Sequence, residues 1–144
     1  MSDAPELTLD ISQNIEIEAA IGDAYRALVR RLSTENSTPD NKAMPMVLEE
    51  WPGGRWFRDL GAGQGHLWGF VQVIKPPNLI EIQGPMFMSY AVAGHLQLRL
   101  TQIAGGTELS LRHQVLGFVQ ENHREGVTHG WDFLLQSVKE MSEQ

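Results

Sequence analysis

The chain has 144 residues, of which 42% are hydrophobic and 8% aromatic, a composition typical of a folded globular protein. Its formal net charge of -7 argues against binding along a nucleic-acid backbone, which requires clustered Lys and Arg. The absence of cysteine excludes disulfides, thiolate chemistry and cysteine-based metal sites.

This length suits one domain with a single core, so we expect residues 1–144 to form one domain. No apolar run approaches the roughly 20 residues that span a bilayer. The segment Met1–Glu6 is acidic and lacks the basic and apolar regions of a signal peptide. We therefore expect a cytoplasmic protein that has no membrane span and binds no nucleic acid.

The first two predicted elements are a strand and a helix. Residues Leu7–Glu18 alternate apolar and polar side chains, as strands do, with a polar break at Ser12–Asn14 that is consistent with a bulge. From Ala19 the apolar period becomes helical, which predicts three to four turns. The apolar stripe consists of Ala20, Ala24, Ala27, Leu28 and the Arg31/Leu32 pair. The compact basic group is interpreted as a solvated helix face: Arg26, Arg30 and Arg31.

After a polar loop at residues 33–42, the pattern predicts six consecutive strands. These are Val47–Trp51, Arg55–Leu60, His66–Lys75, Leu79–Gln83, Tyr90–Ile103 and Thr107–Val119. The glycine run Gly61–Gly65 is interpreted as a hairpin loop, because a phosphate-binding loop would be followed by a helix rather than a strand.

A long helix is predicted at the carboxyl end, up to Met141. Its apolar stripe consists of Val127, Trp131, Leu134, Leu135, Val138 and Met141. Gly126 and Gly130 are poor helix formers, and we interpret them as positions of close packing on the sheet. A strand, a helix, a run of antiparallel strands and a final helix together indicate an α+β fold.

Four short motifs occur in a fixed order along this pattern. They are Pro52-Gly53-Gly54-Arg55, Gly69-x-Val71-x-x-Ile74-x-Pro76-Pro77, Gly106-Thr107-x-Leu109-x-Leu111-x-His113 and Gly130-Trp131-x-x-x-Leu135. With the element order, they resemble the SRPBCC superfamily, also called START-like or Bet v 1-like. Within it, the chain looks most like the group named after the activator of the Hsp90 ATPase.

The resemblance implies a helix-grip fold: a curved antiparallel sheet of about six to seven strands wrapped around a long C-terminal helix, with a shorter helix after the first strand. It also implies a cavity between sheet and helix. The superfamily includes ligand binders, polyketide cyclases and co-chaperones, so the fold alone does not determine function. No residue set in this chain matches the catalytic pattern of the cyclases.

The five histidines show no spacing typical of a shared metal site, and we predict no metal and no cofactor. His113 shares a predicted strand face with Leu109, Leu111 and Val115. That position favours a hydrogen-bonded core residue, with a pocket-lining acid, base or ligand contact as the alternative. Glu49 and Glu50 are adjacent in a predicted strand, so their side chains point to opposite faces. We interpret them as exposed edge charges paired with arginine across the hairpin. The alternative is that one of them points into an apolar cavity, where desolvation would raise its pKa and make it a candidate base.

Large aromatic and sulfur-containing side chains are more numerous than a small core requires, which favours a binding cavity. The candidates for lining or gating it are Trp51, Trp56, Trp68, Met86, Met88, Tyr90, His113 and Trp131. The apolar loop Gly84–Ser89 suggests a lid or a dimer contact.

The leading hypothesis is a protein that binds a small apolar or amphipathic ligand. One alternative is an interaction module that binds a chaperone or a second copy of itself, with an exposed apolar patch at Gly84–Ser89. The other is an enzyme of the cyclase or dehydratase type, which requires a histidine or carboxylate with a perturbed pKa inside the cavity, with His113 as the main candidate.

Overall fold

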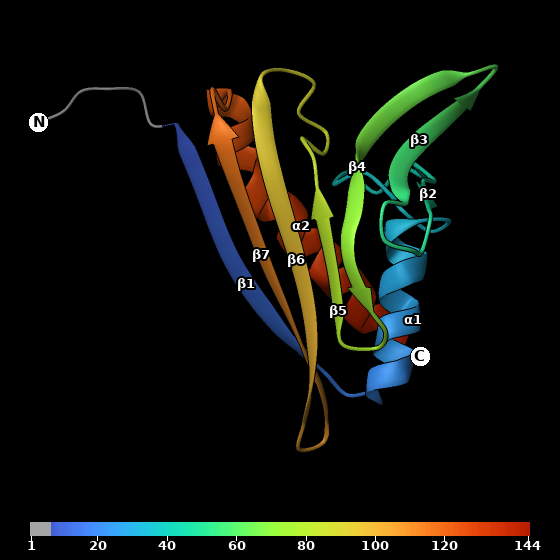
Figure 1. The fold of residues 1–144 in the computed structure, drawn as a ribbon. Coiled ribbons are helices and arrows are strands. Elements are labelled where there is room, and N and C mark those ends of the chain that lie inside the picture. The colour runs from blue at the N-terminus through green and yellow to red at the C-terminus, as the bar shows by residue number, and fades with distance from the viewer. Residues whose placement is uncertain (1–6) are drawn as a thin grey trace, which may run out of the picture.

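The computed structural model describes residues 7–144, which form seven antiparallel strands and two helices. In chain order the elements are β1 (Thr8–Ile17), α1 (Ile21–Leu32), β2 (Val47–Leu48), β3 (Arg55–Gly61), β4 (Gln64–Lys75), β5 (Leu79–Gln83), β6 (Val92–Ile103), β7 (Gly106–Gly117) and α2 (Glu121–Ser142). The strands make one sheet in the order β1-β7-β6-β5-β4-β3-β2. Figure 1 shows α2 crossing one face of the curved sheet, with α1 beside β2 and β3 on the same side. The predicted helix-grip fold is confirmed.

The strand boundaries correct two details of the sequence pattern. β1 pairs with β7 in unbroken register from Thr8↔Leu116 to Ile17↔Thr107, so the polar break at Ser12–Asn14 is not a bulge. The predicted strand Val47–Trp51 is shorter, because β2 ends at Leu48. The sheet instead has register shifts between β3 and β4 and between β4 and β5, and these shifts accompany its curvature there (Figure 1).

The apolar face of the sheet and the inner faces of both helices form one core. Leu96, Leu98 and Leu100 of β6 are buried as their alternation predicts, and Leu109 and Leu111 of β7 lie beside them. The helices contribute Ala24, Ala27, Leu28, Leu32, Val127, Leu134, Leu135 and Val138. α2 packs against α1 and β1, which positions the helix pair on this face.

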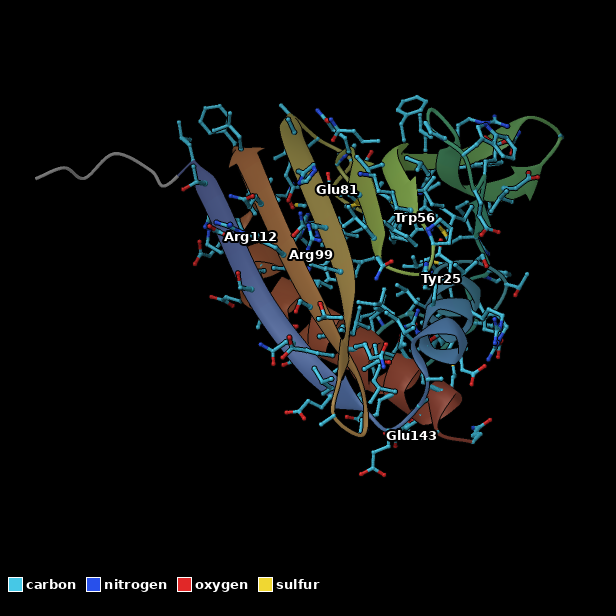
Figure 2. All side chains as sticks on the ribbon, turned by 60° about the horizontal axis from the view of Figure 1, so that its bottom comes forward. Tyr25, Trp56, Glu81, Arg99, Arg112 and Glu143 are labelled. Atoms are coloured by element: carbon cyan, nitrogen blue, oxygen red, sulfur yellow. The ribbon has the colours of Figure 1, made fainter. Side chains whose placement is uncertain are left out.

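The other face of the sheet is mostly polar. Figure 2 labels Glu81, Arg99 and Arg112 there, on β5, β6 and β7. Arg112 donates two hydrogen bonds to the Asp10 carboxylate of β1, at 2.9 and 3.2 Å. Such exposed pairs contribute little to stability. No helix among residues 7–144 is long and apolar enough to cross a bilayer.

Trp56 connects the sheet to the end of α1. Its side chain, labelled in Figure 2, is 1% exposed. Its Nε1–H donates a 2.7 Å hydrogen bond to the carbonyl of Leu32, the last residue of α1. This bond satisfies a backbone acceptor that the end of a helix leaves without an intrahelical partner. Trp56 therefore fixes where α1 ends relative to β3.

Replacing Trp56 by Phe removes this hydrogen bond and part of the buried ring. We expect the free energy of unfolding to fall by about 1–3 kcal/mol, because a buried carbonyl loses its partner. Urea denaturation followed by circular dichroism measures the change. Trp51→Phe is the matched control: this side chain is 56% exposed, and the same substitution there should change stability by less than about 0.5 kcal/mol. Equal losses in both variants would contradict the role of Trp56.

Candidate functional site

A pocket of about 320 Å³ lies between the first half of α2, the loop that follows α1, and the side of the sheet formed by β3 and β4. Its walls are mostly aromatic and aliphatic: Met44, Trp56, Trp68, Phe87, Val127, Trp131, Phe133 and Leu134. The polar side chains at its wall are Arg31, Asn36, Ser37, Thr38, Asn122 and His123. An apolar cavity of this size with a few polar groups is typical of small-molecule sites.

Aromatic side chains hold one another in place along the sheet side of the pocket. The rings of Trp56 and Trp68 meet edge to face at 5.1 Å between centroids, and Trp68 meets Phe87 in the same way at 6.3 Å. Edge-to-face contacts are the preferred arrangement of aromatic quadrupoles. Because Trp56 is itself fixed to Leu32, this row of rings is a preformed wall.

The two methionines of the apolar loop Gly84–Ser89 face inward. Met86 and Met88 are 2% and 0% exposed, and the Met86 amide donates a 2.9 Å hydrogen bond to the Trp68 carbonyl of β4. Phe87 between them is 37% exposed and lines the pocket. The loop therefore covers one side of the pocket and does not present its methionines to solvent.

Tyr90 and His123 form a hydrogen-bonded pair at the start of α2. The Tyr90 hydroxyl and His123 Nδ1 share a 2.7 Å hydrogen bond, and the two rings stack at 5.5 Å. The backbone N–H of Gln120 donates to the same hydroxyl at 3.2 Å. Since His123 also meets Phe87 edge to face, Tyr90 holds a pocket-lining imidazole against the loop.

Trp131 and His113 connect the pocket to the core. The Trp131 ring lines the pocket, while its Nε1–H donates a 3.0 Å hydrogen bond to His113 Nδ1 on β7. An indole nitrogen can only donate, so Nδ1 carries no proton and the neutral ring is protonated at Nε2. That Nε2 is buried and has no partner among residues 7–144. His113 thus acts from inside the core, as the hydrogen-bonded partner of a pocket residue.

The His113 ring is fully buried, and this burial lowers its pKa from 6.5 to about 4, with a smaller contribution from the nearby His95. The unfolded chain binds a proton in a pH range where the folded ring stays neutral. His113 therefore has no effect on the pH dependence of stability above about pH 6.5 and destabilises the fold as the pH falls from about 6.5 towards about 4.

Replacing His113 by Asn should remove this part of the acid sensitivity, because Asn keeps an acceptor for Trp131 and does not titrate. We expect the stability difference between variant and wild type to shift in favour of the variant by up to about 3 kcal/mol between about pH 7 and pH 4. Urea unfolding at several pH values measures it. The exposed His66, changed to Asn, is the control. Parallel pH curves for wild type and H113N would exclude the buried neutral ring.

The structure separates the eight residues that the sequence suggests into three groups. Those that line the pocket are Trp56, Trp68 and Trp131. Those that are absent from its lining are Met86, Met88, Tyr90 and His113. Both methionines are buried, while Tyr90 and His113 hold His123 and Trp131 by hydrogen bonds. Trp51 lies in the turn before β3, outside the pocket and 56% exposed.

Two sequence interpretations are wrong, and both concern pocket residues. Arg31 is 3% exposed and does not belong to the solvated face of α1; its place in the apolar stripe beside Ala27 and Leu28 was the available signal. Gly126 and Gly130 do not pack closely. A Cβ atom added at Gly126 would meet no atom within 4 Å, and one at Gly130 would meet only Pro39 at 3.7 Å, so both glycines border the pocket.

The remaining candidates for chemistry lie elsewhere. Glu49 accepts hydrogen bonds from the backbone and guanidinium of Arg55, at 2.8–2.9 Å, and these hold its pKa at about 2. It is a half-buried charge paired with Arg55 and not a desolvated base. No Asp or Glu lines the pocket, and residues 7–144 contain no cluster of three His, Asp or Glu that could hold a metal ion.

The curved seven-stranded antiparallel sheet and the long C-terminal helix define a helix-grip fold. No protein-family model and no curated protein sequence matches this chain. Solved structures do match. Protein CV1439 from Chromobacterium violaceum has a TM-score of 0.74 at 16% identity, with 94% of this chain and 97% of that chain covered.

An uncharacterised protein from Rhizobium leguminosarum has a TM-score of 0.72 at 17% identity, with 94% and 95% of the two chains covered. The di-domain ARO/CYC StfQ of the steffimycin biosynthetic pathway has a TM-score of 0.69 at 16% identity, over 95% of this chain and 51% of StfQ. The chain therefore spans about half the length of StfQ. At these identities the likeness concerns the fold.

Proposed function

We propose that this chain, as a single domain over residues 1–144, binds a small, largely apolar molecule in the pocket beside α2. The observation that supports the proposal is the pocket itself, about 320 Å³ in volume with walls formed mainly by aromatic rings. Water is poorly accommodated against walls of this kind, because waters beside them find few hydrogen-bond partners. A ligand that fills the pocket gains contacts that water cannot supply.

The two helix glycines support the same reading. A glycine in a helix interior destabilises it by about 0.5–1 kcal/mol relative to alanine, and α2 has two of them four residues apart. Neither allows a close approach to the sheet, since an added Cβ would fit at both positions. Both border the pocket, so their effect is to leave its volume open.

Filling the pocket from Gly130 should therefore remove binding without harming the fold. The neutral dye N-phenyl-1-naphthylamine, whose emission rises in apolar surroundings, serves as the probe. We expect wild type to bind it, and Gly130→Leu to bind it at least about tenfold more weakly, a change of about 1.4 kcal/mol. The unfolding temperature of the variant should be equal or higher, because leucine favours helix and occupies empty space.

Thr128→Leu is the matched control, since it adds the same side chain to an exposed position of α2. It should leave dye binding unchanged. If wild type does not bind the dye, or if both variants bind it like wild type, ligand binding in this pocket is refuted.

A cyclase-type reaction is the second candidate function. It is favoured by the likeness to StfQ, named as an ARO/CYC, and by the His123 imidazole, a titratable group on the pocket wall that Tyr90 orients. The closer resemblance to the activator of the Hsp90 ATPase, and with it a chaperone partner or a homodimer, has less support from the geometry. Its expected apolar patch at Gly84–Ser89 is largely absent, because Met86 and Met88 point into the protein.

A further inference from the structure

The pocket wall contains a buried cation. Arg31 lies in the last turn of α1 and is 3% exposed. Burial lowers the pKa of Arg31, but a guanidinium remains protonated in proteins. A charge removed from water destabilises the fold unless opposite charge or several hydrogen bonds compensate for it. The nearby carbonyl end of α1 supplies part of this compensation through the helix dipole.

The other partners of Arg31 in residues 7–144 are neutral. Nη1 donates a 2.6 Å hydrogen bond to Asn36 Oδ1, and Nη2 a long one of 3.4 Å to the Ser37 carbonyl. Nε is buried without a partner, and the Phe133 ring lies 5.6 Å from Cζ. None of the ion pairs in this part of the chain includes Arg31.

A structural role explains some of this geometry. Asn36 accepts from Arg31 and donates to the Met44 carbonyl at 3.0 Å, so Arg31 braces the loop after α1. That role uses two of the five N–H groups of the guanidinium. This bracing role requires hydrogen-bond donors but no positive charge, so a neutral amide side chain could perform it. The bracing role therefore explains neither the charge nor the unpaired Nε.

We infer that the pocket selects a ligand with an apolar, aromatic-sized body and a carboxylate, and that Arg31 binds this carboxylate. The inference rests on the proposed ligand-binding function and names the chemical class of the ligand. A guanidinium matches the planar geometry of a carboxylate, and hydrogen bonds between charged groups are roughly twice as strong as neutral ones. No Asp or Glu lines the pocket to compete for Arg31.

The net charge of the protein cannot explain a preference for carboxylate ligands. With a formal net charge of -7, the surface repels anions in general. If the pocket binds an anion more tightly than a neutral molecule of the same shape, the preference must therefore come from a positive charge in the pocket wall, which is Arg31. Arg30, the neighbouring residue, is half-exposed and already paired with Glu35 at 2.7 Å, so it provides a control of equal charge.

The test compares two probes of nearly equal shape, 2-naphthoate and 2-naphthamide, by isothermal titration calorimetry with the full chain. We expect wild type to bind the carboxylate at least about tenfold more tightly than the amide. In Arg31→Met this ratio should fall to one or below, while N-phenyl-1-naphthylamine still binds. Arg31→Lys, which keeps the charge but loses the planar fork, should retain part of the preference. Arg30→Met should behave like wild type.

A merely structural Arg31 would change both affinities together and leave their ratio unaltered. If Arg31→Met does not fold, Arg31→Gln, which keeps an N–H donor for Asn36, provides the neutral variant. Equal affinities for the two probes in wild type overturn the inference and leave ligand binding intact, provided that the neutral dye binds. A preference for naphthoate that survives in Arg31→Met or Arg31→Gln also overturns it. Absence of binding by dye, carboxylate and amide alike overturns the inference together with the proposed function.

Discussion

The inner face of the sheet is wider than the helix that covers it. Six spacings between seven neighbouring strands span about 29 Å, whereas a helix with its side chains is about 10 Å across. α2 packs against β1 and α1 and crosses the sheet at an angle, as Figure 1 shows. The β3–β4 end of the sheet must be covered by α1, a loop and large side chains. The pocket lies where this second cover is incomplete.

Trp131 is the residue at which the core ends and the pocket begins. Its indole is 6% exposed and bonds to His113 in the core, while its ring forms part of the pocket wall. Trp56 also belongs to both core and pocket wall, on the sheet side. It donates a hydrogen bond to the end of α1, and its ring meets Trp68 edge to face. Both tryptophans therefore give the wall the rigidity of the core. A wall of this kind does not collapse when the pocket is empty, because collapse would break buried hydrogen bonds.

Most of the fold could be predicted from sequence because hydrophobic periodicity reports which face of an element is buried. The alternation through Leu96, Leu98 and Leu100 predicted β6, and the stripe through Val127 and Val138 predicted α2. The pocket was harder to predict, because core and cavity use the same large apolar residue types. Nothing in the sequence distinguishes Met86, which is buried in the core, from Trp68, which lines the pocket. Arg31 was missed because its charge suggested solvent although its helical phase indicated the interior.

The polar groups of the pocket also fix how a ligand would lie in it. Arg31 contacts Phe133, and His123 is ten residues earlier on the same helix, which corresponds to about 15 Å along its axis. The wall between these two points is apolar, with Val127, Trp131 and the two sheet tryptophans. A carboxylate held at Arg31 would therefore direct the body of the ligand along α2 towards His123. Any chemistry at His123 would then act on the ligand away from its carboxylate, because the two side chains belong to positions almost three turns of α2 apart.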